Sequence, residues 1–440
     1  MVEHPNDRVK IRRILETYIN SAKIEEVLTR FNTEFIDEKL IKLDLKHLEL
    51  KKIPEEICKF KSLLRLDLRY NEIKNLPQNI GELFNLQRLD LRNNKIRSLN
   101  SSLSNLINIK HLDIRENELI TFPDSLSNLL NLRELELSRN NITEYPKSII
   151  KLKKLKILDL RNNGLLTLPK QVTQIKNLRT LDLGNNQLIE IPDRIRDLQR
   201  LYFLNCQKNE IETVSNEIRN LNMLQRLDFR SNYLKQLPKD IFTLNTLVKF
   251  DLISNRFTSI PESIDKLYRL VDFRIYDNQI ESLPESIGNL KQLWRLQAHY
   301  NELEHLPASV GNLIHLKELT LNNNRLTELP ESLWDMNNLE YLELHNNEIT
   351  KISSKIGNLI QLKELNLADN NLNKIPGSIT RLKNLKYLDL RNNEIQNLPE
   401  ALTQLPNLSV LGISNDSLLD ASFRIINILK SRGCKIYTLN

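Results

Sequence analysis

The sequence is poor in the residues on which many catalytic and cofactor sites depend. Only 9 of its 440 residues are glycine, which leaves little room for a glycine-rich loop that binds phosphate groups. It has three cysteines, an odd number, and Cys58, Cys206 and Cys434 are too far apart for a metal-ligand motif or a disulfide framework. We therefore expect no catalytic residue, no metal and no cofactor.

Long hydrophobic segments are also missing. No apolar run approaches the roughly 18 to 20 residues that a membrane span requires. Residues 1–7 contain no hydrophobic segment of the kind that directs secretion. Together with the lack of paired cysteines, this predicts a cytoplasmic protein. The alternative is export by a route that needs no signal.

The sequence is instead dominated by one pattern that recurs every 23 residues. In residues 63–83, leucine or isoleucine occupies positions one, four, six, eleven, fourteen, eighteen and twenty-one, with asparagine at position nine and proline at fifteen. Steps of 23 residues from Asn71 meet an asparagine every time as far as Asn393, fifteen in all, without insertion or deletion. A fixed period of this length is typical of a solenoid, in which each coil contacts only its neighbours.

Each part of the repeat has a physical role. The alternating leucines at positions four and six predict a short strand with its apolar side inward, and successive strands are expected to pair in parallel. The turn that follows is buried, so its backbone groups need partners. The asparagine at position nine is expected to provide them and to form a ladder along the solenoid. Proline at position fifteen suits the first residue of a helical turn.

This frame resembles the leucine-rich repeat (LRR) family. The resemblance is to the 23-residue Leu-Pro-x-x-Ile subtype, which includes Ras-group LRR scaffolds and spirochaete-type bacterial LRR proteins, and it covers roughly residues 40–416. It implies an α/β solenoid, the LRR horseshoe, with a parallel sheet on the concave side and short helical or 3-10 turns on the convex side. It also implies a protein-binding scaffold with a small GTPase or phosphatase as partner, or an exported or surface-displayed bacterial protein that binds a host protein.

Residues 1–39 lie outside the repeat and are predicted to form a helical cap. Asp7 is expected to cap a first helix with an apolar face, and a second helical stretch follows a break at Asn20. The apolar residues assigned to these two helices are Ile11, Ile14, Leu15 and Tyr18, then Val27, Leu28 and Phe31.

The solenoid is expected over residues 40–416, as about 16 full repeats and a truncated one with Asp416 at the asparagine position. Residues 417–440 are predicted to form a second cap. A helix is expected to start at Asp416 or Ser417 and to end at Gly433, and residues 434–439 should add one more parallel strand. The apolar face of this helix is assigned to Leu418, Leu419, Phe423, Ile426 and Leu429.

Function is expected on the strand residues that point away from the core, at positions three, five and seven with position eight beside them. In the first half of the chain, aspartate or glutamate at position five alternates with arginine at position seven, as in Asp67 and Arg69. We interpret this as a self-compensating charge lattice, the alternative being an electropositive patch for an acidic partner. Nucleic acid is not an expected partner, since the interleaved carboxylates would oppose its phosphates.

From residue 203 onward, aromatic, arginine and histidine side chains interrupt this lattice. Such side chains are enriched in the hot spots of protein interfaces. The predicted partner site consists of Phe203, Ile253, Tyr276, Arg295, His299, Tyr300, Tyr341 and His345. His299 and His345 lie two coils apart in one column, about 10 Å at normal strand spacing, so no shared metal is expected. The sequence predicts a monomeric, non-enzymatic interaction scaffold. A metal-dependent or enzymatic module is the alternative that the missing motifs disfavour.

Overall fold

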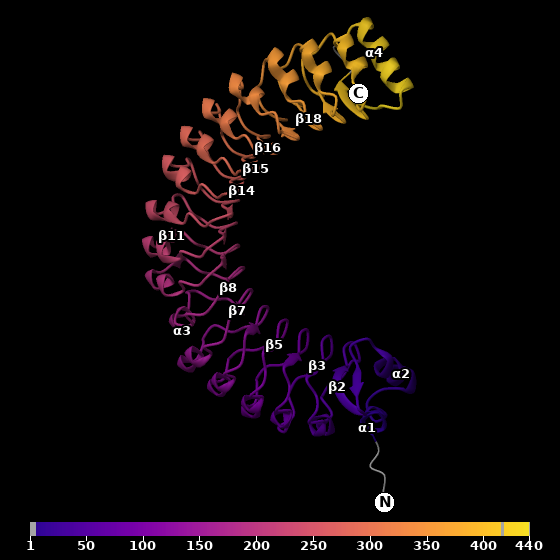
Figure 1. The fold of residues 1–440 in the computed structure, drawn as a ribbon, viewed down its shortest axis with the longest axis vertical. Coiled ribbons are helices and arrows are strands. Elements are labelled where there is room, and N and C mark those ends of the chain that lie inside the picture. Colours follow the sequence, from indigo (N-terminus) through magenta and orange to yellow (C-terminus); the bar gives the residue numbers. More distant parts are fainter. Residues whose placement is uncertain (1–5, 415–417, 440) are drawn as a thin grey trace, which may run out of the picture. The chain divides into compact units, whose positions relative to one another are not determined.

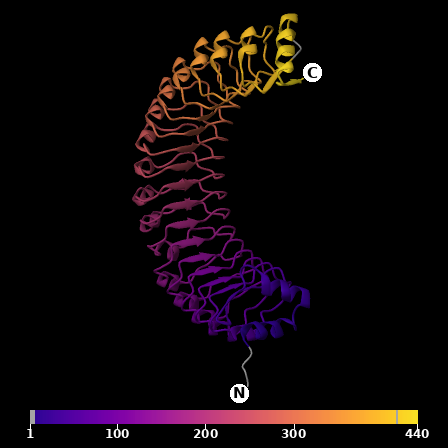
Figure 2. The ribbon, with the colours of Figure 1, turned by 45° about the vertical axis from the view of Figure 1, so that its right-hand side comes forward.

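The structure, a computed structural model, describes residues 6–414 and 418–439. The chain divides into two compact units, residues 1–224 and 225–440. In each unit the coils stack so that strands line one side, called here the sheet side, and short 3-10 helices line the outer side (Figures 1 and 2). The predicted fold class, an α/β leucine-rich repeat solenoid, is confirmed.

The first unit opens with two helices and a hairpin. Helices α1 and α2 are followed by β1, which pairs antiparallel with β2. These elements are α1 Asp7–Leu15, α2 Ser21–Thr29, β1 Glu34–Ile36 and β2 Lys39–Asp44. The predicted cap residue was wrong by one position, because the Asn6 side chain accepts the hydrogen bond from Val9 N, while Asp7 accepts one from Leu40 N at 2.9 Å.

The prediction for Phe31, assigned to the apolar face of the second helix, was also wrong. Helix α2 ends at Thr29, and Phe31 is 99% exposed beyond it, so it does not belong to the buried face. That face consists of Ile24, Val27 and Leu28. The hairpin of β1 and β2 was not predicted, because its turn residues Asp37 and Glu38 adopt positive φ without the glycine or asparagine that usually marks such a turn.

Strands β2 to β8 and β10 of the first unit pair in parallel, each with the next. The strands after β2 are β3 Arg65–Asp67, β4 Arg88–Asp90, β5 His111–Asp113, β6 Glu134–Glu136, β7 Ile157–Asp159, β8 Thr180–Asp182 and β10 Phe203–Asn205. The outer side carries η1 Glu55–Lys59, η2 Ile80–Glu82, η3 Ser101–Asn105, η4 Asp124–Asn128, η5 Lys147–Lys151, α3 Lys170–Thr173, η6 Asp193–Asp197 and η7 Asn216–Asn220. A second small sheet pairs β9 Glu190–Ile191 with β11 Thr213–Val214.

The second unit repeats this arrangement. Its strands pair in parallel from β12 to β21. They are β12 Arg226–Asp228, β13 Lys249–Asp251, β14 Asp272–Arg274, β15 Arg295–Gln297, β16 Glu318–Thr320, β17 Tyr341–Glu343, β18 Glu364–Asn366, β19 Tyr387–Asp389, β20 Val410–Ser414 and β21 Lys435–Leu439. The outer helices are η8 Lys239–Thr243, η9 Glu262–Lys266, η10 Glu285–Asn289, η11 Ala308–Asn312, η12 Glu331–Asp335, η13 Ser354–Asn358, η14 Gly377–Arg381 and η15 Glu400–Gln404.

The strand register places equal positions of successive repeats side by side. Asp272 pairs with Arg295, for example, and Arg295 with Glu318. Side chains at one position therefore form a column that crosses the strands at about 4.8 Å per coil. Everything on the sheet side follows from which residues occupy these columns.

The asparagine ladder at position nine is confirmed. Asn94 donates to the carbonyls of Leu68 and Leu91, both at 2.9 Å, and accepts from Ile73 N at 3.0 Å. A second ladder at position twenty-three was missed. There Asn108 donates to Phe84 O and Asn131 to Ile107 O, at 2.9 and 2.8 Å, so the same residue type also joins coils along an exposed edge.

Helix α4, Asp420–Ser431, and strand β21 complete the second unit. The predicted parallel strand is confirmed, since β21 pairs with β20, and Gly433 follows the helix with a φ of +86°. Ser422, Ile425, Ile426 and Leu429 are buried, whereas Leu419 and Phe423, assigned to the apolar face, are exposed. The predicted start at Asp416 or Ser417 lies outside the described residues. No helix in the described part of the chain has the length and apolarity to cross a bilayer.

Candidate partner-binding surface

The charge lattice predicted for the first unit is built from arginine–carboxylate pairs. Arg69 reaches Asp67 through Nε and Nη2, at 3.0 and 2.6 Å, and its Nε lies 3.3 Å from Asp90 on the next coil. Arg115 and Arg161 make the same pair with Asp113 and Asp159. Positions five and seven therefore neutralise each other, which leaves little net charge there for a partner.

In the first unit, three carboxylates at position five are not bound by the side chain at position seven of their own coil. Arg92 turns away from Asp90 to bind Glu116 at 2.9 Å, and the coils of Glu136 and Asp182 carry serine and glycine at position seven. Burial, followed by neighbouring carboxylates, raises the pKa of Asp90 to about 6 and that of Glu136 to about 7. Burial likewise raises the pKa of Asp182 to about 6. These groups take up protons near neutral pH.

Replacing Glu136 with glutamine is expected to raise the free energy of unfolding near pH 8 and to have little effect near pH 5. The folded-state pKa of Glu136 is about 7, above its ordinary value of 4.5, so its stability contribution is fully present below the unfolded pKa and is lost as pH rises through about 7. An uncharged glutamine avoids that loss, worth about 1 kcal/mol after allowance for solvent screening. Thermal unfolding at the two pH values measures it.

Glu116→Gln is the matched control with the opposite sign. Hydrogen bonds from Asn93 and Arg92 lower the pKa of Glu116, so its contribution is present at neutral pH and fades as pH falls. The variant should therefore be less stable than the native chain near pH 8. An equal response of both variants to pH would contradict this reading of the lattice.

In the second unit, two adjacent coils carry a stacked tyrosine and histidine at position seven, whereas Arg230 and Arg391 keep arginine there. The rings of Tyr276 and His299 lie 4.1 Å apart at an interplanar angle of 16°, and Tyr300 meets His299 edge-on at 5.7 Å. Tyr300 is 56% exposed, while Tyr276 and His299 are partly exposed. Stacking holds these rings in place, so little side-chain entropy would be lost when a partner covers them.

Tyr300 occupies a strained backbone position. Position eight adopts positive φ throughout the repeats, with values of 50° at Tyr300 and 57° at Asp277. Asparagine tolerates this left-handed conformation and recurs at position eight, as in Asn323 and Asn346. An aromatic residue is sterically strained there. Tyr300 keeps this conformation and is 56% exposed, so its ring is accessible to a partner.

Polar groups fix the orientation of the two histidines. His299 Nδ1 lies 3.1 Å from Thr320 Oγ1, and His345 Nδ1 lies 3.0 Å from Asn366 Nδ2 and 3.3 Å from Glu343. Burial, followed by the charge of His345, lowers the pKa of His299, which favours a neutral ring at physiological pH. No group of three or more potential metal ligands occurs among the described residues.

Arg295 and Tyr341 extend this surface. The guanidinium of Arg295 binds Glu318 at 2.7 Å, lies 3.6 Å from Asp272 and lies 4.9 Å from the ring centroid of Trp294. Lys363 lies 6.0 Å from the ring of Tyr341. Trp294 was not predicted because it occupies position two, outside the positions three, five, seven and eight that were expected to face a partner. An exposed tryptophan in a leucine repeat is the signal that would have found it.

Two predicted residues lie apart from this group. Ile253 is only 4% exposed, because the column it occupies is filled on both sides by the larger Arg230 and Tyr276, so it offers little surface to a partner. Phe203 lies on β10 in the first unit, whereas the other seven residues belong to the second. The assignment of the set as partner contacts stays a prediction.

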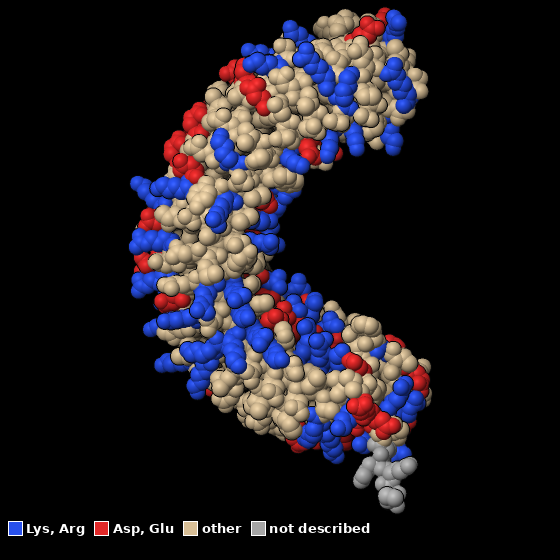
Figure 3. All heavy atoms as spheres, viewed as in Figure 1, with Lys and Arg blue, Asp and Glu red and all other residues tan. Residues whose placement is uncertain are grey.

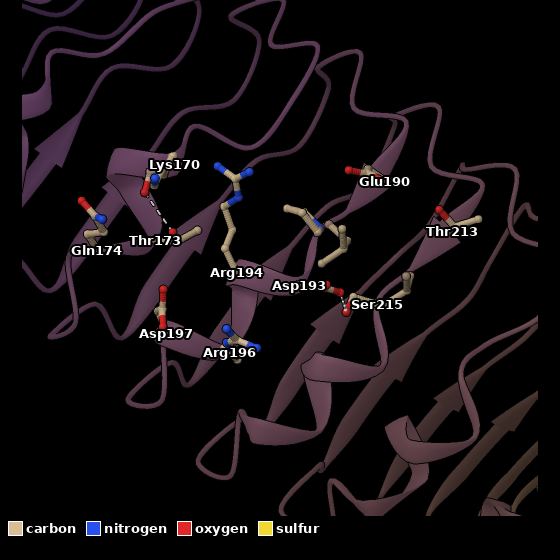
Figure 4. Close-up of a pocket in the computed structure, with 13 residues that line it drawn as sticks. Lys170, Thr173, Gln174, Glu190, Asp193, Arg194, Arg196, Asp197, Thr213 and Ser215 are labelled. Carbon is tan, nitrogen blue, oxygen red and sulfur yellow. Dashed lines mark hydrogen bonds between the residues drawn. The ribbon is translucent and has the colours of Figure 1, made fainter.

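A hollow of about 580 Å³ lies on the outer side of the first unit (Figure 4). It is lined by α3, η6 and the strands β9 and β11, and Ser215 donates to Asp193 at 2.5 Å across one end. Its charged side chains mix both signs, with Lys170, Arg194 and Arg196 beside Glu190, Asp193 and Asp197. They do not converge on a common point in Figure 4, so we assign no catalytic or ligand-binding role to this hollow.

Comparison with known proteins agrees with the repeat frame. The family profile described as leucine-rich repeat region matches residues 121–207, 259–355 and 350–431, and a second leucine rich repeat profile matches residues 84–142. Comparison with curated protein sequences gives no match.

Among solved structures, the Leptospira interrogans LRR protein LIC12759 is 34% identical, with a TM-score of 0.77 over 95% of this chain and 98% of that one. The Listeria monocytogenes internalin inlF is 24% identical, with a TM-score of 0.58 over 76% of this chain and 88% of its own. Toll from the Drosophila Toll–Spatzle complex is similar in fold, at 21% identity and a TM-score of 0.73, over 88% and 56% of the two chains. With matching profiles over more than half of its length and a bacterial relative along nearly all of it, this chain belongs to the leucine-rich repeat family.

Proposed function

We propose that the chain is a protein-binding scaffold without catalytic activity, and that its main partner site is the sheet side of the second unit. The contact residues are Tyr276, Arg295, His299 and Tyr300, with Tyr341 and His345 beside them. The observation that carries the proposal is the partly exposed stack of Tyr276 on His299, with Tyr300 against it in a strained backbone conformation.

The chemistry of this surface suits a protein partner. Aromatic rings supply a large apolar area, and Arg295 and the histidines supply directed polar contacts around it, as at the centre of protein interfaces. The LRR fold commonly mediates protein–protein interaction through the face that the stacked strands present. Family resemblance offers a small GTPase or a phosphatase as partner, and the alternative is a host protein.

Tyr300→Asn tests the site without endangering the fold. Asparagine relieves the left-handed strain, so the variant should be more stable than the native chain by about 1 kcal/mol. It should also lose about tenfold or more in affinity, because an exposed interface tyrosine is removed. Pull-down of partners with native and variant chains, followed by titration of the captured protein, measures affinity, and thermal unfolding measures stability.

Lys208→Asn serves as the control, since it makes the matching replacement of an exposed side chain at position eight, with a φ of 52°, in the first unit and outside the aromatic stack. It should bind the captured partner like the native chain. A partner that binds the native chain and the Tyr300→Asn variant equally would show that the site is elsewhere.

We propose a cytoplasmic location, and the alternative is an exported or surface-displayed protein that uses the same face on a host factor. Fractionation of the producing cells separates the two. Recovery in the soluble intracellular fraction supports the first, and recovery in the medium or on the surface of intact cells supports the second.

A further inference from the structure

Position two of the repeat forms a column of uncompensated cations in the first unit. Lys110, Arg133, Lys156 and Arg179 occupy it in four successive coils. These residues directly precede β5, β6, β7 and β8, which pair in register, so their side chains stand about 4.8 Å apart per coil. Arg133, Lys156 and Arg179 are exposed, and none of them has an ion-pair partner among the residues that the structure describes.

The same position is neutralised elsewhere in the molecule. In the second unit the column reads Lys317, Glu340 and Lys363, and Glu340 binds the two lysines at 2.8 and 2.5 Å. Hydrogen bonds from these lysines lower the pKa of Glu340. The column of the first unit has no carboxylate to play this role, and like charges one coil apart repel each other. A ligand that supplies the missing negative charge would relieve that repulsion.

Next to this column lies a hollow of about 480 Å³. Its lining consists of His111, Arg133, Glu134, Lys156, Ile157, Arg179, Thr180 and Tyr202. Glu134, the acidic member, is bound by His111 at 2.6 Å and does not pair with the three cations. Ile157 and Tyr202 add apolar surface, and Tyr202 is 43% exposed. In Figure 3, lysine and arginine side chains gather over the coils that carry β7, β8 and α3.

We propose that this hollow binds an acidic peptide segment of a partner protein. Carboxylates of the segment would bind Arg133, Lys156 and Arg179, and an apolar side chain between them would rest on Ile157 and Tyr202. A peptide suits the site better than a continuous polyanion, because Ile157 and Tyr202 lie among the cations and would contact an apolar side chain between two carboxylates. The site is in the first unit and does not depend on the surface around Tyr276.

The test is fluorescence polarisation with the full chain and a short labelled peptide in which glutamates alternate with leucine and serine. Arg133→Glu/Arg179→Glu should weaken binding by roughly tenfold or more, since two attractive contacts become repulsive. Lys153→Glu/Lys176→Glu is the matched control, because it makes the same charge change on exposed residues of the same stretch that do not line the hollow. It should change affinity by less than about threefold.

Arg133→Gln/Arg179→Gln tests the same contacts if charge reversal disturbs folding, and circular dichroism checks each variant. Equal losses in the hollow and control variants would show that only net charge matters, which overturns the proposal. No binding of the peptide by the native chain also overturns it. The proposal is also overturned if single-stranded RNA or phosphatidylserine vesicles bind more tightly than the peptide and the same variants weaken that binding equally. Binding at Tyr276 would be unaffected by any of these outcomes.

Discussion

Replacing Asn117 with leucine is expected to lower the free energy of unfolding of the first unit by about 3 to 5 kcal/mol. The Asn117 amide is 8% exposed, accepts from Ile96 N at 3.0 Å and donates to the carbonyls of Leu91 and Ile114 at 3.0 and 3.1 Å. Leucine has a similar volume but leaves these buried backbone groups without partners, each at a cost of about 1 to 3 kcal/mol. Urea unfolding measures the loss, and hydrogen exchange at Ile96 locates it.

Asn108→Leu is the matched control, since it removes the same side chain from the exposed ladder. Asn108 donates to Phe84 O at 2.9 Å from the coil edge, where water can replace it. The expected cost is below about 1 kcal/mol. If both variants lose the same free energy of unfolding, burial does not explain the stability contribution of the position-nine ladder.

The sequence predicted those features that repeat with a fixed offset of one coil. Asn94 bonds backbone groups of its own coil and of the coil before it, so the 23-residue period alone places its partners. The parallel register follows in the same way, as Asp272 beside Arg295 shows. The left-handed backbone at position eight was not predicted, because residues as different as Tyr70, Lys208 and Tyr300 occupy it. The turn imposes the left-handed conformation on position eight, whichever residue occupies it.

The candidate site was predicted less completely than the fold, because it depends on which neighbours fill each column. Ile253 had the right position, but larger neighbours in its column leave it buried. Glu136 was counted as one more member of a neutral lattice, although serine follows at position seven and its pKa rises. Trp294 and Arg133 were missed because position two precedes the strand, yet both face solvent. The exposure and charge of these side chains depend on the length and pairing of their neighbours, and the repeat pattern does not specify either.

Removing the aromatic stack is expected to have the largest effect on recognition. Tyr276→Ala/His299→Ala should weaken binding of a captured partner by about a hundredfold, or roughly 2.7 kcal/mol, since two hot-spot side chains at the centre of the surface are truncated together. The losses in binding free energy of the two single variants should not add up to the loss of the double variant. The ring centroids of Tyr276 and His299 lie 4.1 Å apart, so loss of either ring already releases the other from the stack. Isothermal titration of the four chains measures this coupling.

His47→Ala/Tyr70→Ala is the control, because the chain contains a second histidine–tyrosine stack. Those rings lie 4.4 Å apart at an interplanar angle of 6°, also in adjacent coils, but at the start of the first unit. Both double variants lose one stacked pair and should lose similar stability, about 1 kcal/mol. Only the Tyr276/His299 variant should lose the partner. If the His47/Tyr70 variant loses it as well, loss of fold rather than loss of contact explains the result, and the sheet side of the second unit is not the binding surface.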